Sequence, residues 1–396
     1  MSGSRKYSLT LLGATGFTGG LCASYLARHL PEDVSWAIAG RNQQKLAAVC
    51  QKLRGEGAAN IPEVMVVEVS QPDTLSSMAA SSKVVLTTVG PYVQHGEAVV
   101  QACVEQGSHY CDITGEPEFV NNMICRYHEQ AVRNGCAIVN CCGFDSIPHD
   151  AGVLYTVREL ARIHGRPLDG RVEIEGIVSA SGTFSGGTWQ SAITAFGRPR
   201  ENRDAMRRAK TVVDQHFPRR AGNLSMKPRR NPAGGWLAPM PTIDPIIVQR
   251  SARAIDAYGP DFRYGHYVGV STLPKLVGGM AGVGGLLAAA QFGPLRRKLL
   301  QYRQSGDGPP PEKRAKSWFK VRFNARIGEE RVSCQVSGGD PGYDETAKML
   351  AETGMGLALD NGQPRQTGVV TPVMALEYRL IERLQAANMT FETLSD

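Results

Sequence analysis

The sequence feature that most constrains the fold is the segment LLGATGFTGG, which runs from Leu11 to Gly20. Its glycines follow an apolar run typical of a strand and precede a run typical of an amphipathic helix. In that position a glycine turn lets a pyrophosphate rest on free N–H groups at the start of the helix. A tight turn with a helix cap is the alternative. We predict a dinucleotide site whose residues are Gly13, Thr15, Gly16, Phe17, Thr18 and Gly19.

The rest of the N-terminal region alternates short apolar runs with amphipathic helical runs as far as CAIVNCC, which begins at Cys136. This alternation predicts six strands and an α/β class with a doubly wound parallel sheet of the Rossmann type. At 396 residues the chain is long enough for two domains of ordinary size.

The residues that follow the second predicted strand indicate which nicotinamide cofactor binds. NAD enzymes usually place a carboxylate there, on the ribose 2′-hydroxyl. This chain instead has Arg41, with Lys45 one helical turn further on. A guanidinium group can form paired hydrogen bonds with a 2′-phosphate, so we predict NADP(H). An Arg41 that only contacts solvent is the alternative.

The fourth predicted strand ends in TTVGPYVQHGE. Strand ends on this edge bind ligands in doubly wound folds, so Gly90 and Pro91 are predicted to contact the cofactor. Tyr92 is the first candidate for proton donor or carbonyl polariser, because a phenol can do both and the strand end is expected to direct it toward the bound ring. His95 fits a helix-entry turn better than a functional role.

Two further segments with acidic residues are expected at the same edge. Asp145, Ser146 and His149 lie in GFDSIPHD, where the two domains should meet, and Asp112 and Glu116 follow the fifth strand. Asp145 and Glu116 are predicted catalytic residues, because carboxyl groups can hold a proton or a water. They could equally cap a helix or orient backbone N–H groups.

Charge and composition limit the partners. The net charge of +7 gives no reason to expect nucleic acid, but residues 198–230 hold eleven Lys or Arg against three Asp or Glu, a local charge of +8. An acidic acyl carrier protein or an anionic membrane surface could bind there, or the stretch could be a solvated loop. Residues 268–294 contain one charged residue, Lys275, and suggest an acyl tunnel, peripheral membrane contact or helix packing.

The nine cysteines include no C-x-x-C pair and lie mostly in apolar runs, so we expect reduced thiols and no metal site. The N-terminus shows no cleavable leader. We therefore expect a cytoplasmic protein, with membrane association as the open question.

Several blocks of this sequence resemble the saccharopine dehydrogenase-like oxidoreductase family, and more closely its trans-acting enoyl reductase branch. They are GATGFTG, AGR, TVGPYVQHGEAVVQAC, GSHYCDITGE, CGFDSIPHDAG, GDGPPPEKRAKSWFKVRF, GYDETAKMLAETGMGLAL and VVTPVMALEYRLIERLQAANMTF. The resemblance implies an NADP-binding domain over residues 1–145, an α+β substrate or dimerisation domain over 146–365, and a C-terminal segment, 366–396, that packs back on the first domain. Members of the branch reduce a carbon–carbon double bond in acyl chains built by polyketide synthases that lack their own reductase.

Three functions stay open from the sequence. The first is an NADPH-dependent enoyl reductase of an acyl or polyketide-derived substrate, working with an acyl carrier protein or a polyketide synthase. The second is a saccharopine-type C–N oxidoreductase, which would need several arginines at the cleft. The third is a non-catalytic NADPH-binding module. The oligomeric state stays open too, a homodimer included.

Overall fold

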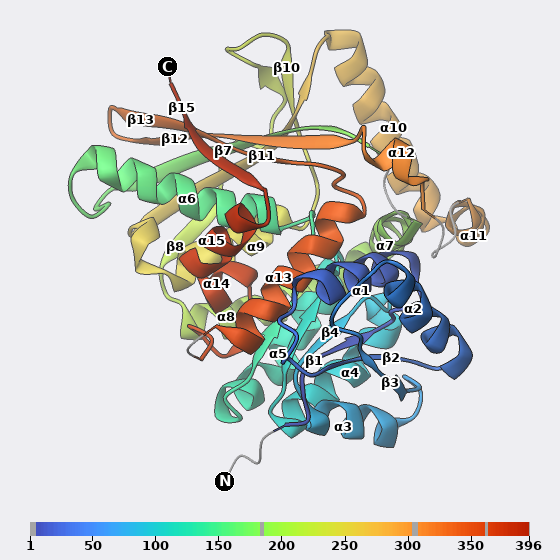
Figure 1. Ribbon diagram of the computed structural model, residues 1–396. Coiled ribbons are helices and arrows are strands. Elements are labelled where there is room, and N and C mark those ends of the chain that lie inside the picture. Colours follow the sequence, from blue (N-terminus) through green and yellow to red (C-terminus); the bar gives the residue numbers. More distant parts are fainter. Residues whose placement is uncertain (1–4, 183–185, 303–307, 361–362, 396) are drawn as a thin grey trace.

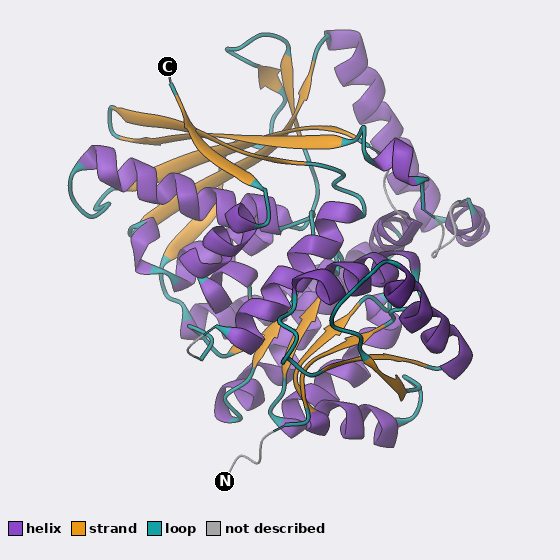
Figure 2. Ribbon diagram, in the orientation of Figure 1, coloured by secondary structure: helices purple, strands orange, loops and turns teal. Residues whose placement is uncertain are grey.

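The computed structural model describes residues 5–182, 186–302, 308–360 and 363–395. Two β-sheets, each packed against helices, make up the molecule (Figure 1). The first sheet is formed mainly by the N-terminal part of the chain, coloured blue to cyan, and the second lies above it in the view of Figures 1 and 2.

The first sheet has seven strands in the order β14-β6-β5-β4-β1-β2-β3 among the described residues, and all of its pairs are parallel. The strand order reverses between β1 and β4, which is where doubly wound folds bind their ligands. The strands are β1 (Tyr7–Leu12), β2 (Trp36–Gly40), β3 (Glu63–Val66), β4 (Ser82–Thr87), β5 (His109–Asp112), β6 (Ala137–Val139) and β14 (Gly368–Val370).

Helices on both faces of this sheet bury its apolar strands. Leu9, Leu11, Val84 and Leu86 are fully buried, as expected for strands covered on both sides. The helices between these strands are α1 (Phe17–His29), α2 (Gln43–Gly55), α3 (Pro72–Ser81), α4 (Tyr92–Gln106) and α5 (Pro117–Arg133). The predicted fold class is confirmed, except that the sheet has one strand more than the six predicted.

The seventh strand comes from the far end of the chain. β14 pairs with β6, so residues 368–370 extend a sheet whose other strands end at Val139. A three-residue strand carries too little alternation to be recognised in a sequence. The segment 366–396 also contains β15 (Thr390–Leu394), which pairs with β13 of the second sheet. The domain boundaries given above stay predictions.

The second sheet is mixed and has the order β15-β13-β12-β7-β11-β10-β9, with β8 paired to β11. β7 and β11 are parallel neighbours, whereas β12 and β13 form an antiparallel hairpin. Its strands are β7 (Arg171–Ser181), β8 (Arg220–Asn223), β9 (Arg229–Arg230), β10 (Trp236–Pro239), β11 (Asp261–Val270), β12 (Trp318–Ile327) and β13 (Glu330–Gly338).

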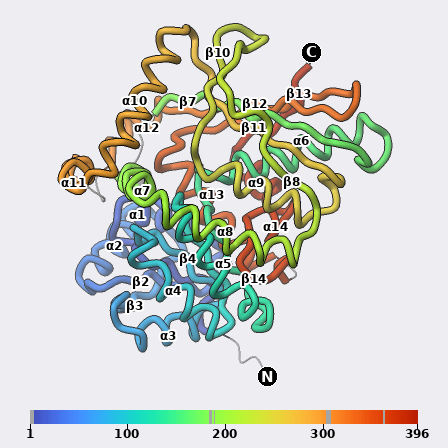
Figure 3. Tube along the Cα trace, turned by 180° about the vertical axis from the view of Figure 1, so that it is seen from behind, coloured from blue at the N-terminus to red at the C-terminus, as the bar shows by residue number. Residues whose placement is uncertain are grey.

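Long helices connect the two sheets. α6 (Ile147–His164) packs on β12 and β13, and α13 (Asp344–Leu359) packs on α1, β4 and β5 of the first sheet. Helix α8 (Pro199–His216) packs on α5, and in the rear view of Figure 3 it crosses the near side of the first sheet. The remaining helices are α7 (Gly186–Phe196), α9 (Asp244–Ala254), η1 (Asp256–Tyr258), α10 (Leu273–Gln291), α11 (Gly293–Gln301), α12 (Pro311–Arg314), α14 (Pro372–Leu376) and α15 (Tyr378–Ala386).

Candidate active site

The glycine turn joins β1 to α1 at the point where the strand order reverses. Gly13 has a φ of +94°, which L-residues with side chains rarely adopt. A Cβ on Gly19 would lie 2.1 Å from the carbonyl oxygen of Gly13, so the helix can approach the strand only with glycine there. Thr15 and Gly16 are exposed, and Gly16 caps α1 without a side-chain hydrogen bond. The first N–H groups of α1 are thus available to an anion.

Arg41 and Lys45 lie beside this turn. Gly13 N donates to the carbonyl oxygen of Ala39, which places the end of β2 next to the turn. Both cationic side chains are exposed, and neither forms an ion pair with a residue in the described part of the chain. Asn42, between them, caps α2 through its hydrogen bond with Lys45 N. These side chains are therefore free to contact a phosphate near the ribose. The arrangement fits an NADP(H) cofactor.

The second part of the chain closes over the start of α1. The guanidinium of Arg314 lies 5.4 Å from the centre of the Phe17 ring, and Tyr343 packs edge-on against the same ring at 4.9 Å. Arg314 is also paired with Asp344 at 2.9 Å. The glycine turn therefore lies at a junction between the first sheet and the residues on either side of β12 and β13 in the second sheet.

Gly90 and Pro91 follow β4 at the same edge of the first sheet, and Gly90 is exposed. The orientation expected for Tyr92 is wrong. Its ring is 4% exposed, and its hydroxyl donates to the carbonyl oxygen of Thr87 at 3.1 Å instead of pointing outward. Burial, followed by the charge of Asp112, raises the pKa of Tyr92 well above its usual value. A buried phenol bonded to the backbone is poorly placed to give a proton to a substrate. His95 is exposed on α4.

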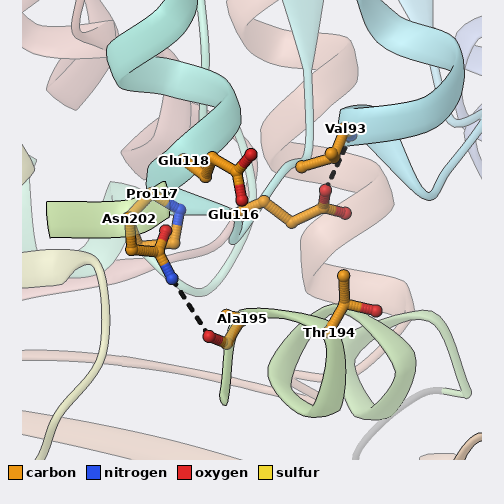
Figure 4. Close-up of a pocket in the computed structure, with 7 residues that line it drawn as sticks. All are labelled: Val93, Glu116, Pro117, Glu118, Thr194, Ala195 and Asn202. Carbon is orange, nitrogen blue, oxygen red and sulfur yellow. Dashed lines mark hydrogen bonds between the residues drawn. The ribbon is translucent and has the colours of Figure 1, made fainter. Parts of the chain in front are cut away.

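Glu116 has the structural role that the sequence left open as an alternative. Its carboxylate accepts hydrogen bonds from the backbone N–H groups of Tyr92 and Val93 and from the hydroxyl of Ser191. It therefore caps the N-terminus of α4, where a negative charge is favoured. Figure 4 shows Glu116 directed toward Val93.

Asp112 orients the neighbouring backbone in the same way. It accepts hydrogen bonds from the N–H groups of Thr114 and Cys141 and from the side chains of Tyr110 and Asn140. Burial nevertheless raises the pKa of Asp112 to about 6. Every one of these partners fixes the loop, so Asp112 and Glu116 hold the strand ends in place.

Asp145 is the predicted catalytic carboxyl group that the structure leaves available. It is half-buried and lies against the loop after β5, where a Cβ on Gly115 would be 3.2 Å from its Oδ2 atom. Burial and the charge of Asp244 raise the pKa of Asp145 to about 6, although His149 opposes this shift. A carboxyl group with a pKa near neutrality can act as a general acid.

Behind Asp145 lies a buried cluster formed by His149, Asp244 and His266. Nδ1 of His149 lies 2.7 Å from Oδ1 of Asp244, and Nε2 of His266 lies 3.5 Å from Oδ2. All three side chains are at most 3% exposed. Burial raises the pKa of Asp244, but the histidine charges outweigh it and the net shift is downward. Burial lowers the pKa of His266 to about 4.

These three residues are of the types that bind transition metals, and their ligand atoms lie within 4.8 Å of one another. The 2.7 Å contact between His149 and Asp244 is close, but neither of its two atoms has a hydrogen-bond partner in the described part of the chain. Sequence reasoning noted His149 and missed Asp244 and His266. They lie about a hundred residues further along the chain, in α9 and β11, and no local motif marks them.

Comparison with known proteins agrees with this geometry. Residues 9–139 match the family model of the saccharopine dehydrogenase NADP-binding domain. A Mycobacterium tuberculosis protein that carries the name of a trans-acting enoyl reductase is 36% identical, over 98% of both chains. The trans-acting enoyl reductase of Mycobacterium ulcerans is 32% identical, over 97% of this chain and 96% of its own.

Among solved structures, the apo saccharopine dehydrogenase (L-Glu forming) of Saccharomyces cerevisiae has the same fold. Its TM-score is 0.54 at 13% identity, and the match covers 98% of this chain and 99% of the yeast chain. The glycine turn, the parallel sheet and the full-length similarity lead to one assignment. The chain is an NADP-dependent oxidoreductase of the saccharopine dehydrogenase-like type and belongs to the trans-acting enoyl reductase family.

Proposed function

We propose that this protein reduces the carbon–carbon double bond of an α,β-unsaturated acyl thioester at the junction between its two sheets. The observation that carries the proposal is the position of Asp145. It lies at the edge of the first sheet that also presents the glycine turn, in a chain similar over its full length to proteins named as enoyl reductases.

The residues of the glycine turn fit NADPH. Gly13 and Gly19 let α1 begin close to the end of β1, and the exposed start of α1 at Gly16 offers free N–H groups to the pyrophosphate. Arg41 and Lys45 would hold the 2′-phosphate. When bound, NADPH supplies the hydride for the β-carbon of the substrate and leaves as NADP⁺.

Asp145 supplies the proton that completes the reduction at the α-carbon. Its raised pKa keeps part of the population protonated near neutral pH. Asp244 contacts the ring of His149, which stands one helical turn from Asp145 in sequence. His149 and Asp244 are thus positioning residues, and Asp145 is the catalytic one.

The full-length similarity to proteins named as trans-acting enoyl reductases favours an acyl substrate over an amino-dicarboxylate. Figure 4 shows a small pocket between the starts of α5 and the helices α7 and α8. Glu116 and Glu118 lie in its wall, but Glu116 is occupied by the backbone N–H groups of Tyr92 and Val93, and Glu118 is paired with Arg198. A volume of about 10 Å³ holds no substrate, so the pocket favours neither substrate class.

An acyl carrier protein of a polyketide synthase is the proposed donor of the substrate. α8 buries Ala205 and Ala209 against the first sheet's helices. Arg200, Arg203 and Arg207 recur on one face at helical spacing, and all three are exposed. An acidic carrier protein would be attracted to this face.

The experiment is to mix the purified protein with NADPH and a panel of enoyl thioesters, to follow NADPH absorbance, and to identify the reduced thioester by mass spectrometry. We expect turnover that Asp145→Asn lowers about 100-fold or more while NADPH affinity is kept. Tight NADPH binding without turnover of any thioester would point to the non-catalytic module. For the carrier protein, Arg203→Glu with Arg207→Glu should raise KM for carrier-bound substrate only, and Arg54→Glu on α2 is the matched control.

A further inference from the structure

α10 exposes an apolar surface that a water-soluble helix would normally bury. It has 19 residues, and its most apolar stretch of 18 residues has a mean hydropathy of 1.4 and is 11% buried. Leu273, Val277 and Met280 are 47%, 58% and 49% exposed. Figure 1 shows the helix at the margin of the molecule, beside the second sheet. It is long and apolar enough to cross a membrane.

Three of the exposed apolar side chains of α10 share one face. Leu273, Val277 and Met280 are separated by four and three residues, which places them one above another on the helix. Further along, Phe292 and Leu295 are 66% and 48% exposed at the start of α11. We call these five residues, from two consecutive helices, the apolar face. Exposed apolar surface of this kind marks a binding site for another molecule or for a membrane.

The charges around the apolar face are all positive. From Leu273 to Gln301 the sequence contains Lys275, Arg296, Arg297 and Lys298 and no acidic residue. Arg297 and Lys298 are exposed on α11. Tyr302, next to them, is 77% exposed. Cations and aromatic rings next to an apolar helix face are typical of segments that lie in the headgroup region of anionic membranes.

The attachment of both ends makes a transmembrane arrangement impossible without unfolding the neighbouring elements. α10 begins three residues after β11, which lies within the second sheet. α11 follows its other end and is bound to α7, because Trp189 Nε1 donates to the carbonyl oxygen of Leu299 at 2.6 Å. α10 itself contacts α7, β10 and β11 along its length. Both ends therefore stay on the same side of a bilayer.

We propose that α10 and the start of α11 bind the surface of an anionic membrane. The apolar face enters the boundary between headgroups and acyl chains, while Arg297 and Lys298 contact lipid phosphates. The helix lies parallel to the membrane plane, and the body of the protein stays in water.

The test is sedimentation with vesicles of phosphatidylcholine alone and of phosphatidylcholine mixed with phosphatidylglycerol. We expect the full chain to bind the mixed vesicles about tenfold or more tightly, since each basic residue near the surface contributes about 1 kcal/mol. Added salt should weaken this binding. With Met280→Trp, brominated lipids should quench the new fluorescence if the face enters the lipid.

Two variants separate the apolar and the electrostatic contributions. Val277→Glu with Met280→Glu should lose binding to both kinds of vesicle. Arg297→Glu with Lys298→Glu should lose only the preference for phosphatidylglycerol. Ile163→Glu is the matched control, because Ile163 is 45% exposed near the end of α6, away from the glycine turn. NADPH affinity should be unchanged in every variant. Unchanged affinity would show that each variant is folded and that its loss of vesicle binding does not come from damage to the cofactor site.

Two results would overturn the proposal. One is a folded, NADPH-binding protein that sediments with neither kind of vesicle. The other is a dimer in light scattering that Val277→Glu with Met280→Glu converts to a monomer, because a second copy of the chain would then cover the apolar face.

Discussion

Nδ1 of His149 and Oδ1 of Asp244 lie 2.7 Å apart in the interior, between the first turn of α6 and the first residue of α9. His266 from β11 contacts the same carboxylate. A buried carboxylate needs such partners, because its charge has been removed from water. The pair fixes the start of α6, and with it the position of Asp145 at the edge of the first sheet.

The first prediction concerns the pH dependence of catalysis. Asp145 must be protonated to act as an acid, and its pKa is about 6, so kcat should fall as pH rises above that value. Asp145→Asn should lower kcat about 100-fold or more and remove this decline, since general acids contribute about that much. Rates measured from pH 5 to pH 9 on a single thioester provide the check. A decline that persists in Asp145→Asn would assign the proton to another group.

The second prediction tests His149 as a positioning residue. Asp244→Asn removes the charge that contacts His149 and helps to raise the pKa of Asp145, so we expect kcat to fall and the decline in activity to move to lower pH. KM for NADPH should stay the same, because the glycine turn is untouched. A loss of thermal stability with an unaltered pH profile would mean that the cluster has a purely structural role.

The third prediction compares adjacent glycines in α1. A Cβ on Gly19 would clash with the carbonyl oxygen of Gly13, whereas on Gly20 it would lie 3.7 Å from that of Ala14. Gly19→Ala should lower the free energy of unfolding by about 1–3 kcal/mol and weaken NADPH binding. Gly20→Ala should be neutral or stabilise by up to about 1 kcal/mol. Thermal denaturation and calorimetric titration with NADPH measure both effects, and equal behaviour of the two variants would exclude a special role for the turn.

The fourth prediction concerns cofactor choice. Arg41→Asp should weaken NADPH binding about tenfold or more, equivalent to about 1.4 kcal/mol, and leave NADH binding nearly unchanged. Arg54→Asp, at the other end of α2, is the control for the change in net charge. Equal affinity of the wild-type protein and Arg41→Asp for NADPH would remove Arg41 from the site.

The fifth prediction is a pH-dependent stability that originates at Asp150. This buried side chain accepts a hydrogen bond from Val373 N, and burial raises its pKa to about 7, against an unfolded value of about 3.9. Its contribution to stability is therefore complete below about pH 4 and is lost as pH rises through 7. Asp150→Asn should flatten the decline of the unfolding free energy over this range, and the exposed Asp73→Asn should not. Denaturant titrations at several pH values measure it.

The sequence determined the first sheet and its cofactor turn because both depend on residues close together along the chain. A strand followed by Gly13, Gly16 and Gly19 has few other ways to fold, and Arg41 follows directly from the next strand. Tyr92 shows the limit of such reasoning. Its place after β4 was correct, but the direction of its hydroxyl depends on the buried carbonyl of Thr87.

Only the tertiary structure decided which carboxyl groups hold the loops and which one is available. Asp112 and Glu116 are occupied by backbone N–H groups that the fold brings to them, whereas Asp145 lies in front of a cluster assembled from α6, α9 and β11. In the same way β14 joins β6 across more than two hundred residues. Side-chain contacts of this kind depend on packing between distant segments, and local sequence patterns carry no record of that packing.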